Sequence, residues 1–211
     1  MIGPSSSHTA GVARIGRISL HIFNQVPDKV EVTFINSFAT TYLGHGSDKA
    51  VIAGILDFET DNPELKNSLE IANDKKLEYH FFTVPTDNTF HPNSLIIKLI
   101  NNSKTTEIAG KSIGGGVVKI VNVDGFECSF TATSPTLIIK AKDVKGSISF
   151  LTDVISHDDC NIANMSVSRR SKNGEGCYFI ELDSELRELT LSYLKSISWI
   201  SELIYLNIKN L

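Results

Sequence analysis

A change of rhythm near residue 135 constrains the fold more than any other feature of the sequence. After this point, apolar runs and turn signals follow one another as strand, helix, strand, strand, helix, strand. Before it, helical and strand patterns are mixed without steady alternation. A chain of 211 residues is long enough for two such units. We therefore predict an α+β protein with domains at residues 1–133 and 134–211.

The second half has the order of a ferredoxin-like βαββαβ unit. Asn173-Gly174 between two apolar runs is typical of a tight β-hairpin turn. Alternating or β-branched runs predict strands at 136–141, 162–169, 177–182 and 203–208, and amphipathic spacing predicts helices at 147–157 and 184–196.

The first half is a mixed α/β domain by the same criteria. Pro63 follows Asn62 and fits the first turn of a helix, and Asp124-Gly125 fits a hairpin turn. The patterns predict helices at 9–24, 47–56 and 63–76, and strands at 30–35, 79–84, 94–100, 117–123 and 126–130.

A run of hydroxyl side chains with one histidine leads into the first predicted helix. Gly3-Pro4 disfavours regular structure, so the run is predicted to be a loop. The N-terminus of a helix offers unpaired N–H groups and a positive dipole, which suit a carboxylate or a phosphate. The alternative is a helix cap, but a cap needs one hydroxyl. Four hydroxyls and an imidazole favour the ligand site, and the candidates are Ser5, Ser6, Ser7, His8 and Thr9.

Glycines mark two further candidate sites. His45 lies between Gly44 and Gly46, which would let the backbone approach a ligand closely; the alternative is a histidine in a surface turn. A loop at Gly114, Gly115 and Gly116 could bind an anion through its N–H groups, or could be a hinge or a tight strand entry.

Composition excludes several classes of function. The net charge of −4 comes without a basic stripe, so we expect no nucleic-acid partner. No apolar run approaches about 18 residues and no signal segment is evident, so we expect no membrane span and a cytoplasmic protein. Three widely spaced cysteines, at 128, 160 and 177, match no metal-ligand pattern and suit a reducing compartment. We expect no metal site within this chain.

Two family resemblances extend over nearly the whole sequence. The first half resembles the beta chain of bacterial iron–sulfur-dependent L-serine dehydratase, and the second half resembles an ACT domain, a regulatory module that often binds amino acids. The first resemblance rests on Gly3–Gly11, Gly44–Ala50, His91–Ser94 and Ser112–Gly116, and the second on Asp143–Gly146 and Asn161–Met165.

The first resemblance implies elimination of water from L-serine to give pyruvate and ammonia. It implies a [4Fe–4S] cluster held by a separate alpha subunit and not by this chain. His8 and His45 would then face that cluster as catalytic residues, with one imidazole removing the Cα proton. The hydroxyls of Ser5, Ser6, Ser7 and Thr9 would bind the substrate carboxylate or position a loop of the alpha subunit.

The ACT resemblance implies regulation and self-association. A possible ligand site at the junction of paired ACT domains would be lined by Gly146, Ser147, Asn161 and Ile162. The alternative function for the whole chain is a non-catalytic, amino-acid-sensing module that controls a partner enzyme. Proximity of His8 and His45 would favour a shared active site, and separation of the two would favour the sensor.

Overall fold

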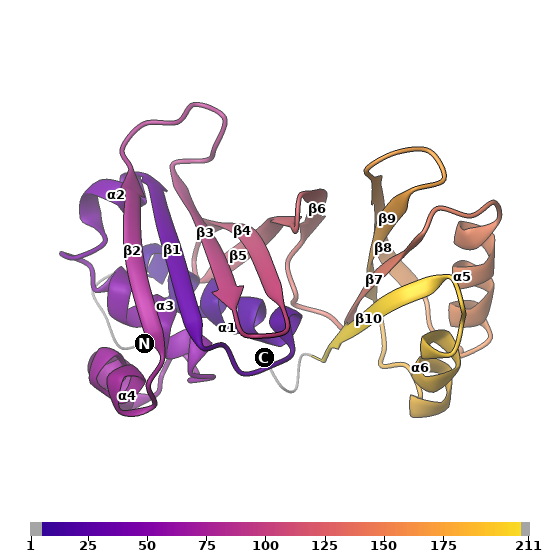
Figure 1. Cartoon of the computed structure of the whole chain (residues 1–211), viewed down its shortest axis with the longest axis horizontal. Coiled ribbons are helices and arrows are strands. Elements are labelled where there is room, and N and C mark those ends of the chain that lie inside the picture. The colour runs from indigo at the N-terminus through magenta and orange to yellow at the C-terminus, as the bar shows by residue number, and fades with distance from the viewer. Residues whose placement is uncertain (1–5, 208–211) are drawn as a thin grey trace. The chain divides into compact units, whose positions relative to one another are not determined.

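The computed structural model describes residues 6–207, which form two compact units. The first unit ends at Gly125 and the second begins at Phe126. The predicted strand at 126–130 therefore counts with the second unit. Figure 1 shows the two units with their helices and strands labelled.

One sheet with helices on one face makes up the first unit (Figure 1). Its strands lie in the order β2-β1-β3-β4-β5. The β1–β2 pair is parallel, and β1–β3, β3–β4 and β4–β5 are antiparallel. The strands are β1 (Lys29–Asn36), β2 (Glu78–Val84), β3 (Asn93–Ile100), β4 (Thr105–Gly114) and β5 (Val117–Val123).

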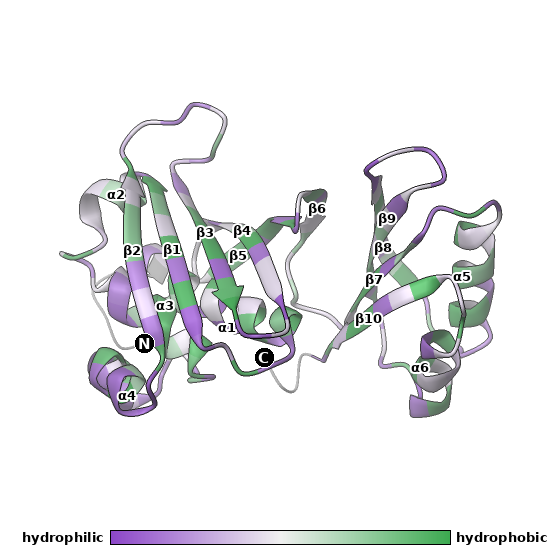
Figure 2. Ribbon diagram, viewed as in Figure 1, coloured by the Kyte–Doolittle hydropathy of each residue, from purple (hydrophilic) through white to green (hydrophobic). Residues whose placement is uncertain are grey.

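Alternating apolar residues along these strands form the core beneath the helices, and Figure 2 shows the alternation as bands along β1 and β3. Val30, Val32 and Phe34 of β1 are fully buried. The helical elements are a π-turn (Ser6–Ala10), α1 (Gly11–Phe23), α2 (Ser37–Thr41), α3 (Ser47–Ile55), a 3₁₀ turn (Pro63–Asn67) and α4 (Ser68–Asp74).

Helices α1 and α3 cross at two glycines. A Cβ atom added to Gly16 would lie 2.5 Å from the carbonyl oxygen of Val51, and one added to Gly54 would lie 2.0 Å from that of Ala13. No side chain larger than hydrogen fits at either position. This close crossing fixes the relative positions of the segments that precede α1 and α3.

The second unit has the predicted βαββαβ order. Its sheet runs β10-β7-β9-β8, with all three neighbouring pairs antiparallel. An additional strand, β6, contributes Phe130, which stacks on Phe179 at 5.8 Å between ring centroids. The elements are β6 (Phe126–Phe130), β7 (Thr136–Lys142), α5 (Ser147–Ser156), β8 (Ile162–Arg169), β9 (Glu175–Leu182), α6 (Glu188–Lys195) and β10 (Ile200–Leu206).

Three sequence predictions differ from the structure. Strand β4 was not predicted, because Thr106 and Ser112 take fully buried positions that apolar residues usually mark. Helix α2 is five residues long, too short for a helical period to show. The helix predicted at 63–76 is a 3₁₀ turn followed by the seven-residue helix α4.

Candidate active site

The two predicted histidines lie against each other in the first unit. The ring centroids of His8 and His45 are 4.6 Å apart, with 38° between the ring planes. Their segments are joined by reciprocal hydrogen bonds to main-chain carbonyls. The Thr9 hydroxyl donates to the carbonyl oxygen of His45 at 3.1 Å, and the Ser47 hydroxyl donates to that of His8 at 2.7 Å. Two motifs 36 residues apart therefore form one constellation.

Local backbone geometry differs from the predicted loop. Residues 6–10 form a π-turn that continues into α1, instead of a loop that ends at residue 9. The N-cap position of α3 is Gly46, and no side chain caps the helix there. Gly46 has φ +66, a conformation that glycine adopts at little cost. The Ser47 hydroxyl is thus free to hold the π-turn.

His8 is held on two sides. Its Nδ1 lies 3.0 Å from the Ser7 hydroxyl, and the ring of Phe38 meets its ring nearly edge-on at 4.9 Å. Burial lowers the pKa of His8 from its ordinary value, and the neighbouring His45 lowers it further. The His8 imidazole is therefore predominantly neutral at pH 7, the form that can accept a proton.

Two buried polar side-chain atoms next to the start of α3 have no hydrogen-bond partner among residues 6–207. They are Nδ1 of His45 and Oδ1 of Asp48, a residue that is only 8% exposed. Buried polar groups in native proteins are nearly always paired, so such atoms call for an explanation. A ligand or a second polypeptide that supplies a hydrogen-bonding group would provide one. Asp48 follows Ser47 in the first turn of α3, and on this ground we add it to the candidate residues.

The hydroxyl residues divide into different roles. Thr9 is 2% exposed and its hydroxyl is used within the protein, as described above. Ser7 contacts the imidazole of His8. Ser5 and the side chain of Ser6 lie outside the described structure. Among the predicted carboxylate-binding residues that the structure describes, Ser7 contacts the imidazole ring of a candidate catalytic residue, His8.

The glycine loop is the turn of the β4–β5 hairpin. Gly114 ends β4, and the φ values of Gly114, Gly115 and Gly116 are +96°, +61° and +78°. A larger residue at these positions would have a strained backbone, because φ is positive, but its Cβ would not clash, since no atom lies within 4 Å of an added Cβ. The geometry accounts for the glycines as a tight turn, and anion binding there stays a prediction.

The predicted ACT ligand residues lie at two element starts in the second unit. Gly146 precedes α5 with φ +86, and Ser147 places its hydroxyl 2.7 Å from that of Tyr178 in the core. The Asn161 amide donates to Asp183 at 2.9 Å, and Ile162 is the first residue of β8. Ligand binding at these residues also stays a prediction.

The cysteines do not provide the donor set of an iron–sulfur cluster. Burial raises the pKa of Cys128 far above its usual range, with a further contribution from Cys177, so the metal-binding thiolate is disfavoured. The Cys160 thiol donates to the carbonyl oxygen of Ser184. Within residues 6–207, no group of three or more His, Cys, Asp and Glu side chains could hold a metal ion.

None of the helices within residues 6–207 is long and apolar enough to span a membrane.

Comparison with known proteins finds a family model over the first half of the chain and relatives over most of its length. The model of the serine dehydratase beta-chain family matches residues 1–122. The chain is 36% identical to a probable L-serine dehydratase beta chain of Bacillus subtilis over 93% of its own length and 89% of the relative. It is 34% identical to the L-serine dehydratase beta chain of Peptoniphilus asaccharolyticus over 89% and 85%. A D-3-phosphoglycerate dehydrogenase of Methanocaldococcus jannaschii is 25% identical over 92% of this chain but only 36% of the relative.

Proposed function

The chain belongs to the serine dehydratase beta-chain family, and on this premise we propose that it works as the beta subunit of an L-serine dehydratase. Together with an alpha subunit, it would deaminate L-serine to pyruvate and ammonia. In this reaction a proton leaves Cα and the hydroxyl group leaves Cβ, so the site must hold the substrate and accept a proton.

The single observation that carries the proposal is the contact between His8 and His45. An imidazole that is neutral near pH 7 can take a proton from carbon, and a positioned general base typically contributes about 10²- to 10⁴-fold to the rate. Ser7 at Nδ1 and Phe38 at the ring edge restrict the orientation of the His8 imidazole. His8 and His45 are the candidate bases, and Ser7 is a candidate hydrogen-bond donor to the substrate carboxylate.

The site on this chain is one part of a larger one in our proposal. The orphaned atoms of His45 and Asp48 are explained if an alpha subunit or the substrate completes their hydrogen bonds. The family implies an iron–sulfur cluster, which the donors among residues 6–207 do not fit, and we assign it to the alpha subunit. The three cysteines form no disulfide with one another, which suits a cytoplasmic location.

The test is reconstitution with a cognate alpha subunit under anaerobic conditions, followed by a serine-to-pyruvate assay. We expect His8→Ala or His45→Ala to lower kcat by about 10²- to 10⁴-fold for whichever residue is the base. His157→Ala is the matched control, because that side chain is 78% exposed in the second unit. Full turnover by both site variants would refute the assignment, and pyruvate formation by this chain alone would refute the two-subunit reaction.

A second function, amino-acid sensing, is favoured by the match to a dehydrogenase. The match covers 92% of this chain and about a third of the dehydrogenase. The dehydrogenase does not carry out the lyase reaction, so a role that the two proteins have in common would be independent of that reaction. Self-association through the second unit would accompany this role. Equilibrium dialysis of the full chain with L-serine tests it. Binding abolished by Asn161→Ala and retained by His45→Ala would support a sensor site, and no binding without the alpha subunit would contradict it.

A further inference from the structure

Asn36 has an unusual backbone conformation at the end of β1. Its φ and ψ are 55° and −121°, on the side of the conformational map that favours glycine. Such residues persist where the surrounding structure holds them, and they concentrate at functional sites. Asn36 immediately precedes α2, and α2 carries Phe38, the aromatic neighbour of His8.

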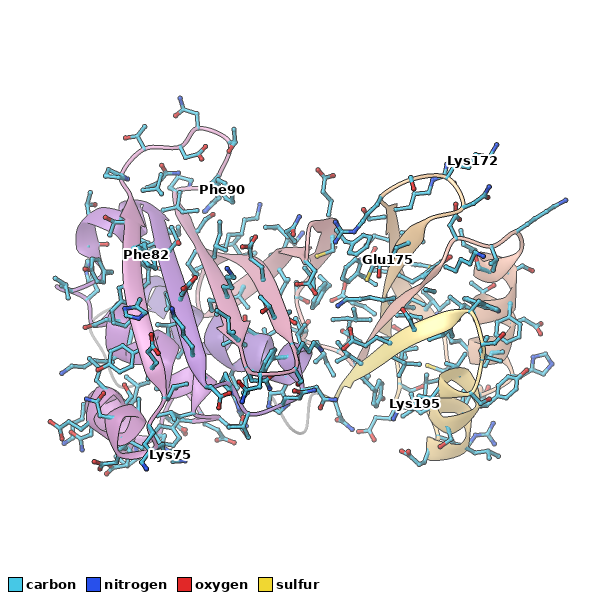
Figure 3. The ribbon with its side chains drawn as sticks, in the orientation of Figure 1. Lys75, Phe82, Phe90, Lys172, Glu175 and Lys195 are labelled. Atoms are coloured by element: carbon cyan, nitrogen blue, oxygen red, sulfur yellow. The ribbon has the colours of Figure 1, made fainter. Side chains whose placement is uncertain are left out.

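The side chain of Asn36 locks the loop between β2 and β3. Its Oδ1 accepts a hydrogen bond from the Asp87 N–H at 2.7 Å. Its Nδ2 donates to the carbonyl oxygens of Asp87 at 2.9 Å and Phe90 at 3.2 Å. One amide thus binds both ends of a four-residue stretch of the loop. Figure 3 shows Phe90 on this loop, which rises from the end of the sheet where α2 lies (Figure 1).

The same lock extends to α2. The N–H of Ser37, its first residue, donates to the carbonyl oxygen of Pro92 at 2.9 Å. The next residue, Phe38, is fully buried, and the centroid of its ring lies 4.9 Å from the centroid of the His8 ring. A continuous path of contacts therefore runs from the 85–92 loop through Asn36 and α2 to the candidate base.

We propose that Asn36 is a positioning residue for the His8–His45 site. Its amide fixes the loop against the end of β1, and its backbone sets the direction in which α2 starts. Phe38 is thereby seated against the ring of His8, and the ring takes a single orientation. The kinetic consequence rests on the proposed function, whereas the structural consequence for His8 does not.

The test compares two asparagines whose side-chain amides each hold a loop by hydrogen bonds, Asn36 and Asn101. Asn36→Gly keeps a backbone that tolerates φ +55 but removes the amide. The matched control is Asn101→Ala, after the other end of β3. The Asn101 amide donates to Gln25 at 2.7 Å and to the carbonyl of Val26 at 3.2 Å, and its oxygen accepts from the N–H groups of Ser103 and Lys104.

The first readout is the NMR spectrum of the full chain without an alpha subunit. The ring-proton signals of His8 lie within the ring currents of Phe38 and His45, so we expect them to shift or broaden in Asn36→Gly and to stay in place in Asn101→Ala. Unchanged His8 signals in folded Asn36→Gly would overturn the proposal. If that variant does not fold, Asn36→Asp replaces it, because the carboxylate keeps the acceptor for the Asp87 N–H and loses every bond that Nδ2 donates.

The second readout is kinetic, in the reconstituted enzyme. Misplacing a catalytic group by about 1 Å can cost on the order of 100-fold in rate. We expect kcat to fall by about 10- to 100-fold in Asn36→Gly with a much smaller change in KM, and both constants to be retained in Asn101→Ala. Wild-type enzyme without activity would contradict the proposed function alone. A shifted His8 spectrum with kcat within about twofold of wild type would overturn the positioning role.

Discussion

Replacing Gly54 by alanine tests whether α1 and α3 cross as closely as their two glycines indicate. The new Cβ would lie 2.0 Å from the Ala13 carbonyl oxygen, and ordinary contact begins at 3.4 Å, so the helices would have to part by about 1.4 Å. The clashing atoms are backbone and cannot rotate away. Overpacking of this kind costs up to about 3 kcal/mol. Alanine recovers about 1 kcal/mol in helix propensity, which leaves a net loss of about 2 kcal/mol.

Thermal unfolding of the full chain measures this loss. About 2 kcal/mol corresponds to a melting temperature lower by about 4–8 °C for a chain of this size. Gly44→Ala is the control, because its added Cβ would lie 3.7 Å from the nearest atom, the Thr41 carbonyl oxygen. We expect that variant to stay within about 0.5 kcal/mol of wild type. A melting temperature of Gly54→Ala equal to or above that of wild type would refute the argument from close crossing.

Three further predictions concern titration and buried polar pairs. The pKa of His8 is lowered by burial and by its neighbour His45, so the folded chain binds fewer protons than the unfolded chain. The free energy of unfolding should therefore fall as pH drops below 6.5. The urea midpoints measured at about pH 7.5 and about pH 5.5 should differ less in His8→Gln than in wild type. Burial raises the pKa of Asp158, but hydrogen bonds from Arg187 lower it more, so the stabilisation by the Asp158 carboxylate is lost only at acid pH. The melting temperature of Asp158→Asn should be lower than that of wild type at neutral pH, and the two should converge below about pH 4. Tyr178→Phe leaves the buried Ser147 hydroxyl without its partner and should cost about 1–3 kcal/mol in urea unfolding, and adding Ser147→Ala should recover part of it.

Much of the fold could be predicted from local pattern, because its core strands bury one face each. The β-branched run at 30–35 became β1 at Lys29–Asn36, and the predicted strand at 126–130 has the same bounds as β6. The pattern failed at β4, where fully buried Thr106 and Ser112 alternate with exposed Glu107 and Ile113. Neither hydroxyl has a hydrogen-bond partner among residues 6–207, so neither polarity nor local pattern marks these two positions as buried.

The contact between the two histidines could be inferred from the sequence only through a family resemblance. Nothing in local spacing brings residue 8 to residue 45. The long-range contact depends on Gly16 and Gly54, whose missing Cβ atoms let α1 and α3 approach, and neither glycine lies in a motif. Asn36 was also missed, because an asparagine at a strand end is a common turn residue. Its positive φ and its bonds to the 85–92 loop exist only in the folded chain.

The hydroxyl-rich opening of the chain therefore has two kinds of member. Thr9 donates to the main-chain carbonyl of His45, and Ser47, from the second segment, donates to that of His8, so each hydroxyl holds backbone in place and uses no ring nitrogen. Ser7 contacts an imidazole itself. A helix cap would have satisfied N–H groups of its own helix, whereas these bonds join two segments. The scaffold thus consists of reciprocal hydroxyl–carbonyl bonds, and under the proposed function a second component completes the hydrogen bonds of His45 and Asp48.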